Sequence, residues 1–166
     1  MDYNIFDKIT TFIFDVDGVL TNSQVLITEK GELLRSMSTR DGQAIKFALD
    51  AGYHVAIITK GGSAGVKSRL AGLGITDIYD KLETKHAAYA DIIAKYNLKQ
   101  EEILYMGDDL PDIPLLKQVG LSACPYDASR DVLDIATYIS PEKGGHGAVR
   151  DVIERVMRCQ GKWAMV

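Results

Sequence analysis

Five carboxylates follow two apolar runs of the chain, and their number and placement indicate a cation site that handles phosphate. They are Asp15 and Asp17 after the first run, and Asp108, Asp109 and Asp112 after the second. Gathering so many like charges is costly unless a cation neutralises them. Oxygen ligands at a partly open site favour Mg²⁺, which keeps several waters and shares oxygens with substrate phosphates. The pattern therefore predicts a magnesium site where the two runs end, provided that the runs are neighbouring strands.

The first acidic pair has a spacing that suits covalent phosphoryl transfer. Residues two positions apart at an extended strand end point to the same side. One carboxylate of Asp15 and Asp17 can therefore attack phosphorus while the other reaches the leaving oxygen. Carboxylate nucleophiles that form aspartyl-phosphates are an established covalent strategy. Gly18 would let the backbone bend sharply away from the metal. Each acidic motif alone also fits an ordinary turn, and the placement of both motifs together is what favours catalysis.

A hydroxyl and a cation complete the candidate set. Thr59 directly follows another apolar run and lies between the two acidic motifs in the chain. Lys85 opens an amphipathic stretch, where its charge could offset the repulsion between a nucleophile and a phosphate. Lys81 is a competing candidate for this role, and a lysine at a helix start is most often a solvated surface residue.

Short apolar runs alternate with longer amphipathic stretches along the chain. This alternation is typical of a parallel sheet with helices on both faces, the doubly wound or Rossmann-like α/β fold. We expect strands at 11–14, 55–58, 103–106, 121–123 and 138–139. We expect helices at 43–51, 63–73, 84–96, 111–118 and 148–158. Ligands of such sheets bind outside the carboxyl ends of the strands, where the acidic motifs lie.

One segment breaks the alternation between the first strand and the first helix. Residues 24–28 and 32–37 are strand-like, and Glu29-Lys-Gly31 between them forms a turn. We therefore expect a β-hairpin flap over about 20–38, which is too short to be a second domain. The chain of 166 residues has no linker or repeat, so we expect one domain over 1–166.

Composition excludes several classes of function. Lys and Arg number 19 against 23 Asp and Glu, so the net charge of −4 argues against binding to nucleic acid by counterion release. No apolar stretch approaches the roughly 20 residues of a membrane span. The N-terminus lacks the apolar region of a secretory signal. We expect a cytoplasmic protein that binds neither nucleic acid nor membrane.

Together, these motifs resemble the haloacid dehalogenase-like (HAD) phosphatase superfamily. Its four signatures appear in order as Asp15-x-Asp17-Gly18-Val19, Thr59, Lys85 and Gly107-Asp108-Asp109-x-x-Asp112. The hairpin and the segments 38–42, 69–75 and 143–150 look like those of a capless branch, the 3-deoxy-D-manno-octulosonate 8-phosphate (KDO 8-phosphate) phosphatases. In that branch a small hairpin replaces the usual cap domain.

The resemblance implies a Mg²⁺-dependent phosphomonoester hydrolase that acts through an aspartyl-phosphate and supplies KDO for lipopolysaccharide biosynthesis. It implies Asp15 as the nucleophile and Asp17 as the general acid and then the base. Thr59 and Lys85 would bind the phosphoryl group. The family forms homotetramers in which hairpins associate and a neighbour helps cover each site, so we expect self-association.

The resemblance also implies a ligand set for the metal. Mg²⁺ would be held by the carboxylates of Asp15 and Asp108 and by the backbone carbonyl of Asp17. Asp109 and Asp112 would lie behind these ligands or orient the lysine.

Residues that recognise the rest of the substrate are expected outside the four signatures. Arg69 falls where the family places a basic residue facing the substrate, and the further candidates are Arg40, Lys60, Gly61 and His146. In this family the threonine is usually followed by Gly-Arg, whereas Lys60 and Gly61 follow it here, and Arg often stands where this chain has His146.

Two alternatives to a KDO 8-phosphate phosphatase remain. The departures from the family pattern leave room for another sugar-acid phosphate, such as a sialic-acid-type 9-phosphate. A receiver-like phospho-acceptor domain also combines clustered Asp residues with Thr and Lys on a doubly wound sheet. A receiver places its acidic pair first and its acceptor Asp on a middle strand, which is the reverse of the order in this chain.

Overall fold

A six-stranded parallel sheet forms the centre of residues 4–163, the part of the chain that the computed structural model describes. Its strands are β1 (Thr11–Phe14), β4 (His54–Ile58), β5 (Asp77–Tyr79), β6 (Ile103–Met106), β7 (Leu121–Cys124) and β8 (Tyr138–Ile139). They lie in the order β5-β4-β1-β6-β7-β8, and each neighbouring pair is parallel. The predicted α/β sheet is confirmed, with β5 as an additional edge strand.

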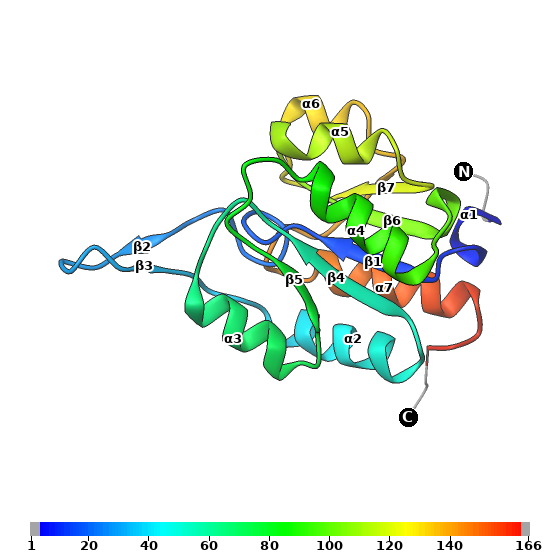
Figure 1. Ribbon diagram of the computed structural model, residues 1–166, viewed down its shortest axis with the longest axis horizontal. Helices are drawn as coiled ribbons and strands as arrows, with labels where there is room; N and C mark the ends of the chain where they lie inside the picture. The colour runs from blue at the N-terminus through cyan, green and yellow to red at the C-terminus, as the bar shows by residue number, and fades with distance from the viewer. Residues whose placement is uncertain (1–3, 164–166) are drawn as a thin grey trace.

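Helices cover both faces of the sheet (Figure 1). One face packs against α1 (Asn4–Asp7), α2 (Thr39–Asp50), α3 (Ala64–Gly72) and α7 (Ala148–Cys159). The other face packs against α4 (His86–Tyr96), α5 (Ile113–Leu116) and α6 (Arg130–Leu133). The short 3-10 helices η1 (Gln100–Glu102) and η2 (Leu110–Asp112) flank β6.

The strands are apolar at consecutive positions because both of their faces are buried. In β1, Phe12 and Phe14 belong to the core beneath α2 and α7, whereas Ile13 belongs to the core beneath α4. All three side chains are fully buried. A sheet of this kind exposes mainly its strand ends, and functional side chains are therefore expected there.

Two helical segments differ from the prediction. The stretch predicted as one helix over 111–118 is the 3-10 helix η2 followed by the four-residue helix α5, and α6 is an additional short helix.

Two helix starts also differ from the prediction. Helix α2 begins at Thr39, four residues before the predicted start, because the Ser38 side chain accepts hydrogen bonds from the backbone N–H groups of Arg40 and Asp41. Helix α4 begins at His86, so Lys85 precedes the helix as its N-cap residue instead of lying inside it.

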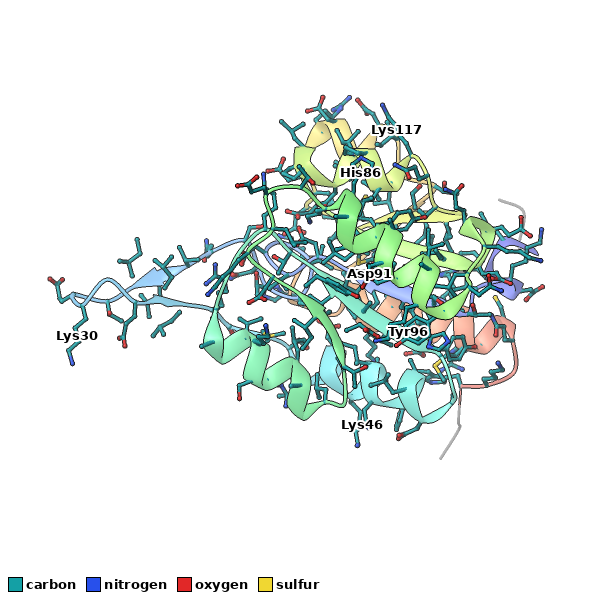
Figure 2. The ribbon with its side chains drawn as sticks, viewed as in Figure 1. Lys30, Lys46, His86, Asp91, Tyr96 and Lys117 are labelled. Atoms are coloured by element: carbon teal, nitrogen blue, oxygen red, sulfur yellow. The ribbon has the colours of Figure 1, made fainter. Side chains whose placement is uncertain are left out.

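The predicted hairpin is present, with shorter strands than expected. It consists of β2 (Leu26–Ile27) and β3 (Leu33–Leu34), which pair antiparallel. The hairpin leaves the body of the molecule after β1 and stands away from it (Figure 1), with Lys30 near its tip (Figure 2). Leu26 and Ile27 are 68% and 65% exposed. None of the helices in residues 4–163 combines the length and apolarity that crossing a membrane requires.

Candidate active site

The acidic cleft lies at the point where the order of the strands reverses, with β4 and β5 on one side of β1 and β6, β7 and β8 on the other. Strand β1 sits between β4 and β6, so the loops after these three strands meet at one edge. They form a cleft of about 270 Å³. The residues that line it are Asp15, Asp17, Ser23, Thr59, Lys60, Gly61, Lys85, Asp108, Asp109 and Pro111. The structure thus brings together the residues of all four signature motifs.

Lys85 lies at the floor of this cleft and is 4% exposed. Its Nζ is 2.8 Å from Asp15 Oδ2 and 2.6 Å from Asp112 Oδ1. Burial alone would lower the pKa of Lys85, but the charges of the two carboxylates outweigh it and raise that pKa above its usual value. Lys85 therefore remains a cation beside Asp15. The competing candidate, Lys81, is exposed, and its stem lies against Gly62.

Asp112 is fully buried and orients its neighbours. Its Oδ1 accepts hydrogen bonds from Lys85 Nζ and, at 2.5 Å, from the hydroxyl of Tyr105. Its Oδ2 accepts from the backbone N–H groups of Asp108 and Asp109, at 2.9 and 3.2 Å. These four bonds occupy both carboxylate oxygens and fix the loop that carries Asp108.

Tyr105 is a site residue that sequence reasoning missed. Its hydroxyl also accepts a hydrogen bond from Lys85 Nζ at 3.2 Å. Burial, followed by the charges of Asp112 and Asp15, raises the pKa of Tyr105 well above 10, so the hydroxyl remains a donor to Asp112. In the sequence, Tyr105 looks like one more residue of an apolar strand, and only the fold places its hydroxyl beside Lys85.

Asp15 and Asp108 experience a negative field that Lys85 offsets only in part. Burial, followed by the charge of Asp112, raises the pKa of Asp15 to about 6. Burial and the charges of Asp112 and Asp15 raise the pKa of Asp108 to about 7. Ligand atoms of Asp15, Asp108 and Asp112 all lie within 4.8 Å of one another, as they would around a metal ion. A divalent cation would relieve the repulsion among these carboxylates.

Gly18 creates the space that Asp108 occupies. A Cβ atom on Gly18 would lie 1.9 Å from Asp108 Oδ2, and the residue has a φ of +86°, which favours glycine. Asp15 itself is held by a hydrogen bond from the backbone N–H of Val16 to Oδ1, at 2.7 Å. The motif Asp-x-Asp-Gly thus supplies carboxylates to the cleft and also the glycine turn that leaves room for the Asp108 side chain.

Asp17 lies at the mouth of the cleft and pairs with Arg35, a second residue that sequence reasoning missed. Arg35 Nε is 2.6 Å from Asp17 Oδ1, and Nη2 is 3.2 Å from Oδ2. Arg35 directly follows β3 and belongs to the returning arm of the hairpin. No local motif marks it, because its partner lies 18 positions earlier in the chain.

The loop after β4 forms the opposite wall of the cleft. Thr59 is 6% exposed, and its hydroxyl accepts a hydrogen bond from the Gly61 backbone N–H at 3.2 Å. A Cβ atom on Gly61 would lie 2.9 Å from Asp17 Oδ2, so glycine leaves room for the acidic side chain. Lys60 is exposed at the edge of the cleft.

The other predicted substrate contacts do not line this cleft within one chain. The guanidinium of Arg69 lies over Gly42, at the start of α2. Arg40 and His146 line a separate groove along α7. Contact of these three residues with a substrate remains a prediction.

The glycine-rich segment 143–147 supports the acidic loop from behind. A Cβ atom on Gly144 would lie 1.9 Å from the carbonyl oxygen of Gly18, and the Gly145 N–H donates to the carbonyl of Val19 at 2.9 Å. Asp41 Oδ1 accepts from the backbone N–H of Arg150 at 2.9 Å and so holds the start of α7 against α2. These glycines allow two backbone segments to pack directly against each other.

Comparisons with known proteins agree with this geometry. A family model described as haloacid dehalogenase-like hydrolase matches residues 68–153, just over half of the 166 residues. The chain is 38% identical over 156 residues to 3-deoxy-D-manno-octulosonate 8-phosphate phosphatase KdsC of Escherichia coli K12. That match covers 94% of this chain and 83% of the relative.

Solved structures give the same result for the fold. The crystal structure of the corresponding phosphatase from Yersinia pestis matches with a TM-score of 0.94 and 36% identity, over 96% of this chain and 86% of that one. The phosphatase from Moraxella catarrhalis, solved in complex with magnesium, phosphate and KDO, matches with a TM-score of 0.93 and 29% identity. The latter match covers 97% of this chain and 92% of that one.

Proposed function

Because the chain belongs to the haloacid dehalogenase-like hydrolases, in the branch of the KDO 8-phosphate phosphatases, we propose that it hydrolyses KDO 8-phosphate through a phosphoryl group carried on Asp15. The observation that carries the proposal is the convergence of Asp15, Asp108 and Lys85 at the carboxyl ends of β1 and β6. The whole chain would act as a single catalytic domain whose hairpin replaces a cap.

Magnesium fits the donor set of the cleft. The carboxylates of Asp15 and Asp108 and the backbone carbonyl of Asp17 would hold it, and their oxygen atoms are the ligands that Mg²⁺ prefers. Asp112 is less suited to direct ligation, because both of its oxygens already accept hydrogen bonds. When bound, the ion supplies positive charge that offsets the phosphoryl oxygens and the nucleophile.

In the first half-reaction, a carboxylate oxygen of Asp15 attacks phosphorus while the bond from phosphorus to the sugar oxygen breaks. The charge of Lys85 and the hydroxyl of Thr59 bind the phosphoryl oxygens, since this chemistry depends on positioning and electrostatics. Asp17 donates a proton to the departing alkoxide. The products are an aspartyl-phosphate on Asp15 and the free sugar acid.

In the second half-reaction, Asp17 accepts a proton from water, and that water attacks phosphorus. The bond from phosphorus to the Asp15 oxygen breaks, inorganic phosphate leaves, and Asp17 is protonated again. One carboxyl group thus serves as acid and then as base, because the proton that Asp17 gives to the alkoxide in the first step is replaced by one from water in the second. Lys85 holds Asp15 in place through both steps.

A phosphate-release assay tests the proposal. Purified protein would be given KDO 8-phosphate, a nine-carbon sialic-acid-type 9-phosphate and simple sugar phosphates, each with Mg²⁺ and with EDTA. We expect release to be fastest from KDO 8-phosphate and to be lost in EDTA. Preference for the nine-carbon substrate would reassign the substrate, and activity that is indifferent to EDTA would refute the magnesium-dependent mechanism.

We also propose that the protein self-associates through its hairpin, as a homotetramer. The hairpin exposes apolar side chains on both of its strands, at Leu26, Ile27, Leu33 and Leu34, and at Val25 just before β2. A two-stranded hairpin is marginally stable by itself, and an exposed apolar patch of this kind favours association with another chain. In such an assembly a neighbouring copy would help cover the open cleft, and contacts from Arg40, Arg69 or His146 to a substrate would come from that neighbour.

Light scattering of hairpin variants tests the assembly. The double variant Leu26→Asp with Ile27→Asp places two charges in the apolar patch, and we expect it to be monomeric. The matched control Lys30→Asp changes the net charge by the same amount at the hairpin tip and should remain assembled. A wild-type chain that is fully active as a monomer would contradict the proposal.

A further inference from the structure

We propose that Arg35 is a positioning residue of the active site, which holds the Asp17 carboxylate so that its Oδ2 atom faces the phosphoryl-binding loop. This inference rests on the proposed function, because it assigns Arg35 a role through the acid and base of that reaction. It extends the site to the hairpin, which contributes none of the four signature motifs.

The guanidinium of Arg35 is engaged on all of its nitrogen atoms. Nε and Nη2 donate to the two carboxylate oxygens of Asp17, and Nη1 donates to the backbone carbonyl of Leu33 at 3.1 Å. The Arg35 side chain is 7% exposed, whereas that of Asp17 is 39% exposed. Arg35 is the more buried partner and is also held by the Leu33 carbonyl, so the carboxylate at the cleft mouth takes its orientation from the arginine.

The two hydrogen bonds to Asp17 are unequal, and the difference distinguishes its oxygens. Oδ1 lies 2.6 Å from Nε, whereas Oδ2 lies 3.2 Å from Nη2. Oδ2 is also the oxygen beside Gly61, in the loop that carries Thr59. Arg35 thus binds Oδ1 tightly and leaves Oδ2 the less tightly held oxygen, on the side where the phosphate would bind. In the first half-reaction, the proton would pass from Oδ2 to the leaving oxygen as the ester bond breaks.

The surroundings of the pair favour this arrangement. A small cavity of about 20 Å³ beside Asp17 and Arg35 is walled by apolar side chains, among them Ile57, Val66 and Leu70. An apolar wall strengthens the electrostatic attraction between the pair, because less water screens it. The planar fork of arginine also fixes the direction of a carboxylate, which the single ammonium group of lysine does not do.

A positioning role and a purely structural role predict different kinetics. Proton donation matters for an alkyl phosphate, whose alkoxide is a poor leaving group, and matters little for p-nitrophenyl phosphate, whose phenolate leaves without protonation. Asp17 also acts as the base of the second half-reaction, which is the same for both esters, so only kcat/KM, which reports transfer of the phosphoryl group to Asp15, separates the two esters. A misplaced Asp17 should therefore lower kcat/KM for the alkyl ester selectively. A disordered hairpin or a damaged cleft should slow hydrolysis of both esters together.

The test compares kcat/KM of Arg35→Met with that of wild type on KDO 8-phosphate and on p-nitrophenyl phosphate, with Mg²⁺ present. We expect kcat/KM on the alkyl ester to fall by about 10- to 100-fold, the range that misplacement of a general acid produces. On p-nitrophenyl phosphate we expect a loss of less than about threefold. Arg35→Lys keeps the charge without the fork and should remain well below wild type on the alkyl ester.

Two further variants complete the test. Arg158→Met removes another two-pronged arginine contact, to Glu154 on α7 away from the cleft, and should leave both activities unchanged. Adding Arg35→Met to Asp17→Asn should cause no further loss on the alkyl ester, since both changes act through one group. Equal losses on the two esters, additive losses in the double variant, or full activity of Arg35→Lys would overturn the role of Arg35. A wild-type chain inactive on both esters would overturn the proposed function and this inference with it.

Discussion

Replacement of Asp108 by asparagine is expected to stabilise the metal-free protein at pH 8 while it abolishes catalysis. Asp108 lies in a cluster of carboxylates, and burial and the neighbouring charges raise its pKa from 3.8 to about 7. At pH 8 the metal-free folded state must therefore hold this group ionised in an unfavourable place. Asparagine has a similar shape and no charge, so the variant removes that penalty together with a ligand for the metal.

The magnitude follows from the pKa difference between the folded and unfolded states. A rise of about three pKa units corresponds to about 4 kcal/mol, at about 1.4 kcal/mol per unit. Asp108 is partly exposed, and solvent screening reduces this to about 2–3 kcal/mol. For a chain of this length, we expect the midpoint of thermal unfolding to rise by about 5–10 °C.

The effect has a defined dependence on pH. A carboxyl group with a raised pKa binds a proton in the folded state at a pH where the unfolded chain does not. The free energy of unfolding of the metal-free wild type should therefore rise as the pH falls through about 7 for Asp108 and about 6 for Asp15. The gain from Asp108→Asn should be full at pH 8 and should shrink to less than about 1 kcal/mol near pH 4, where the folded wild type is protonated at this position and the unfolded chain is close to half protonated.

Urea unfolding in EDTA, at pH 8 and again near pH 4, measures this effect. The control Asp134→Asn changes an exposed carboxylate on the surface and should shift stability by less than about 0.5 kcal/mol. Added Mg²⁺ should stabilise the wild type and leave the Asp108 variant nearly unchanged, because only the former binds it well. A variant that is no more stable than wild type at pH 8, or equally stabilised at both pH values, would refute the electrostatic reasoning.

Three further changes have defined outcomes. Asp15→Asn should abolish phosphate release with an unchanged circular dichroism spectrum, and residual turnover above background would remove Asp15 as the nucleophile. Tyr105→Phe should lower kcat about tenfold and stability by about 1–3 kcal/mol, since the variant loses the buried hydroxyl that Lys85 contacts; steady-state kinetics and urea unfolding measure both. Gly18→Ala should eliminate activity because its Cβ would occupy the place of the Asp108 carboxylate, and a wild-type rate for this variant would contradict the packing described.

The central strands and the acidic cleft were predictable because their signals are local. Strands buried on both faces are apolar at consecutive positions, and the acidic motifs directly follow two of them. The edge strand β5 was missed because it begins with Asp77, a buried carboxylate that is compensated by Lys95 and Tyr96 of α4. That compensation comes from a distant part of the chain, and no window around β5 contains it.

The site residues also divide into those with a local sequence signal and those that depend on distant partners. The signature residues lie beside strand ends, so their placement follows from the order of the strands. Arg35 and Tyr105 act through partners that are distant in sequence or hidden by an apolar pattern, and only the packed structure identifies them. Lys60 and Gly61, at which this chain departs from the family pattern, line the cleft, whereas the basic residues expected from α2 and α3 lie elsewhere in the single chain.

The contact between Gly144 and the carbonyl of Gly18 has a consequence for synthesis of the protein on the ribosome. The loop that carries the nucleophile is synthesised early, but its support arrives only with the segment before α7. A nascent chain that has already exposed its acidic loop therefore lacks one wall of that loop until the last helix emerges and docks. Competence to turn over phosphate esters should appear late, as a property of the finished fold.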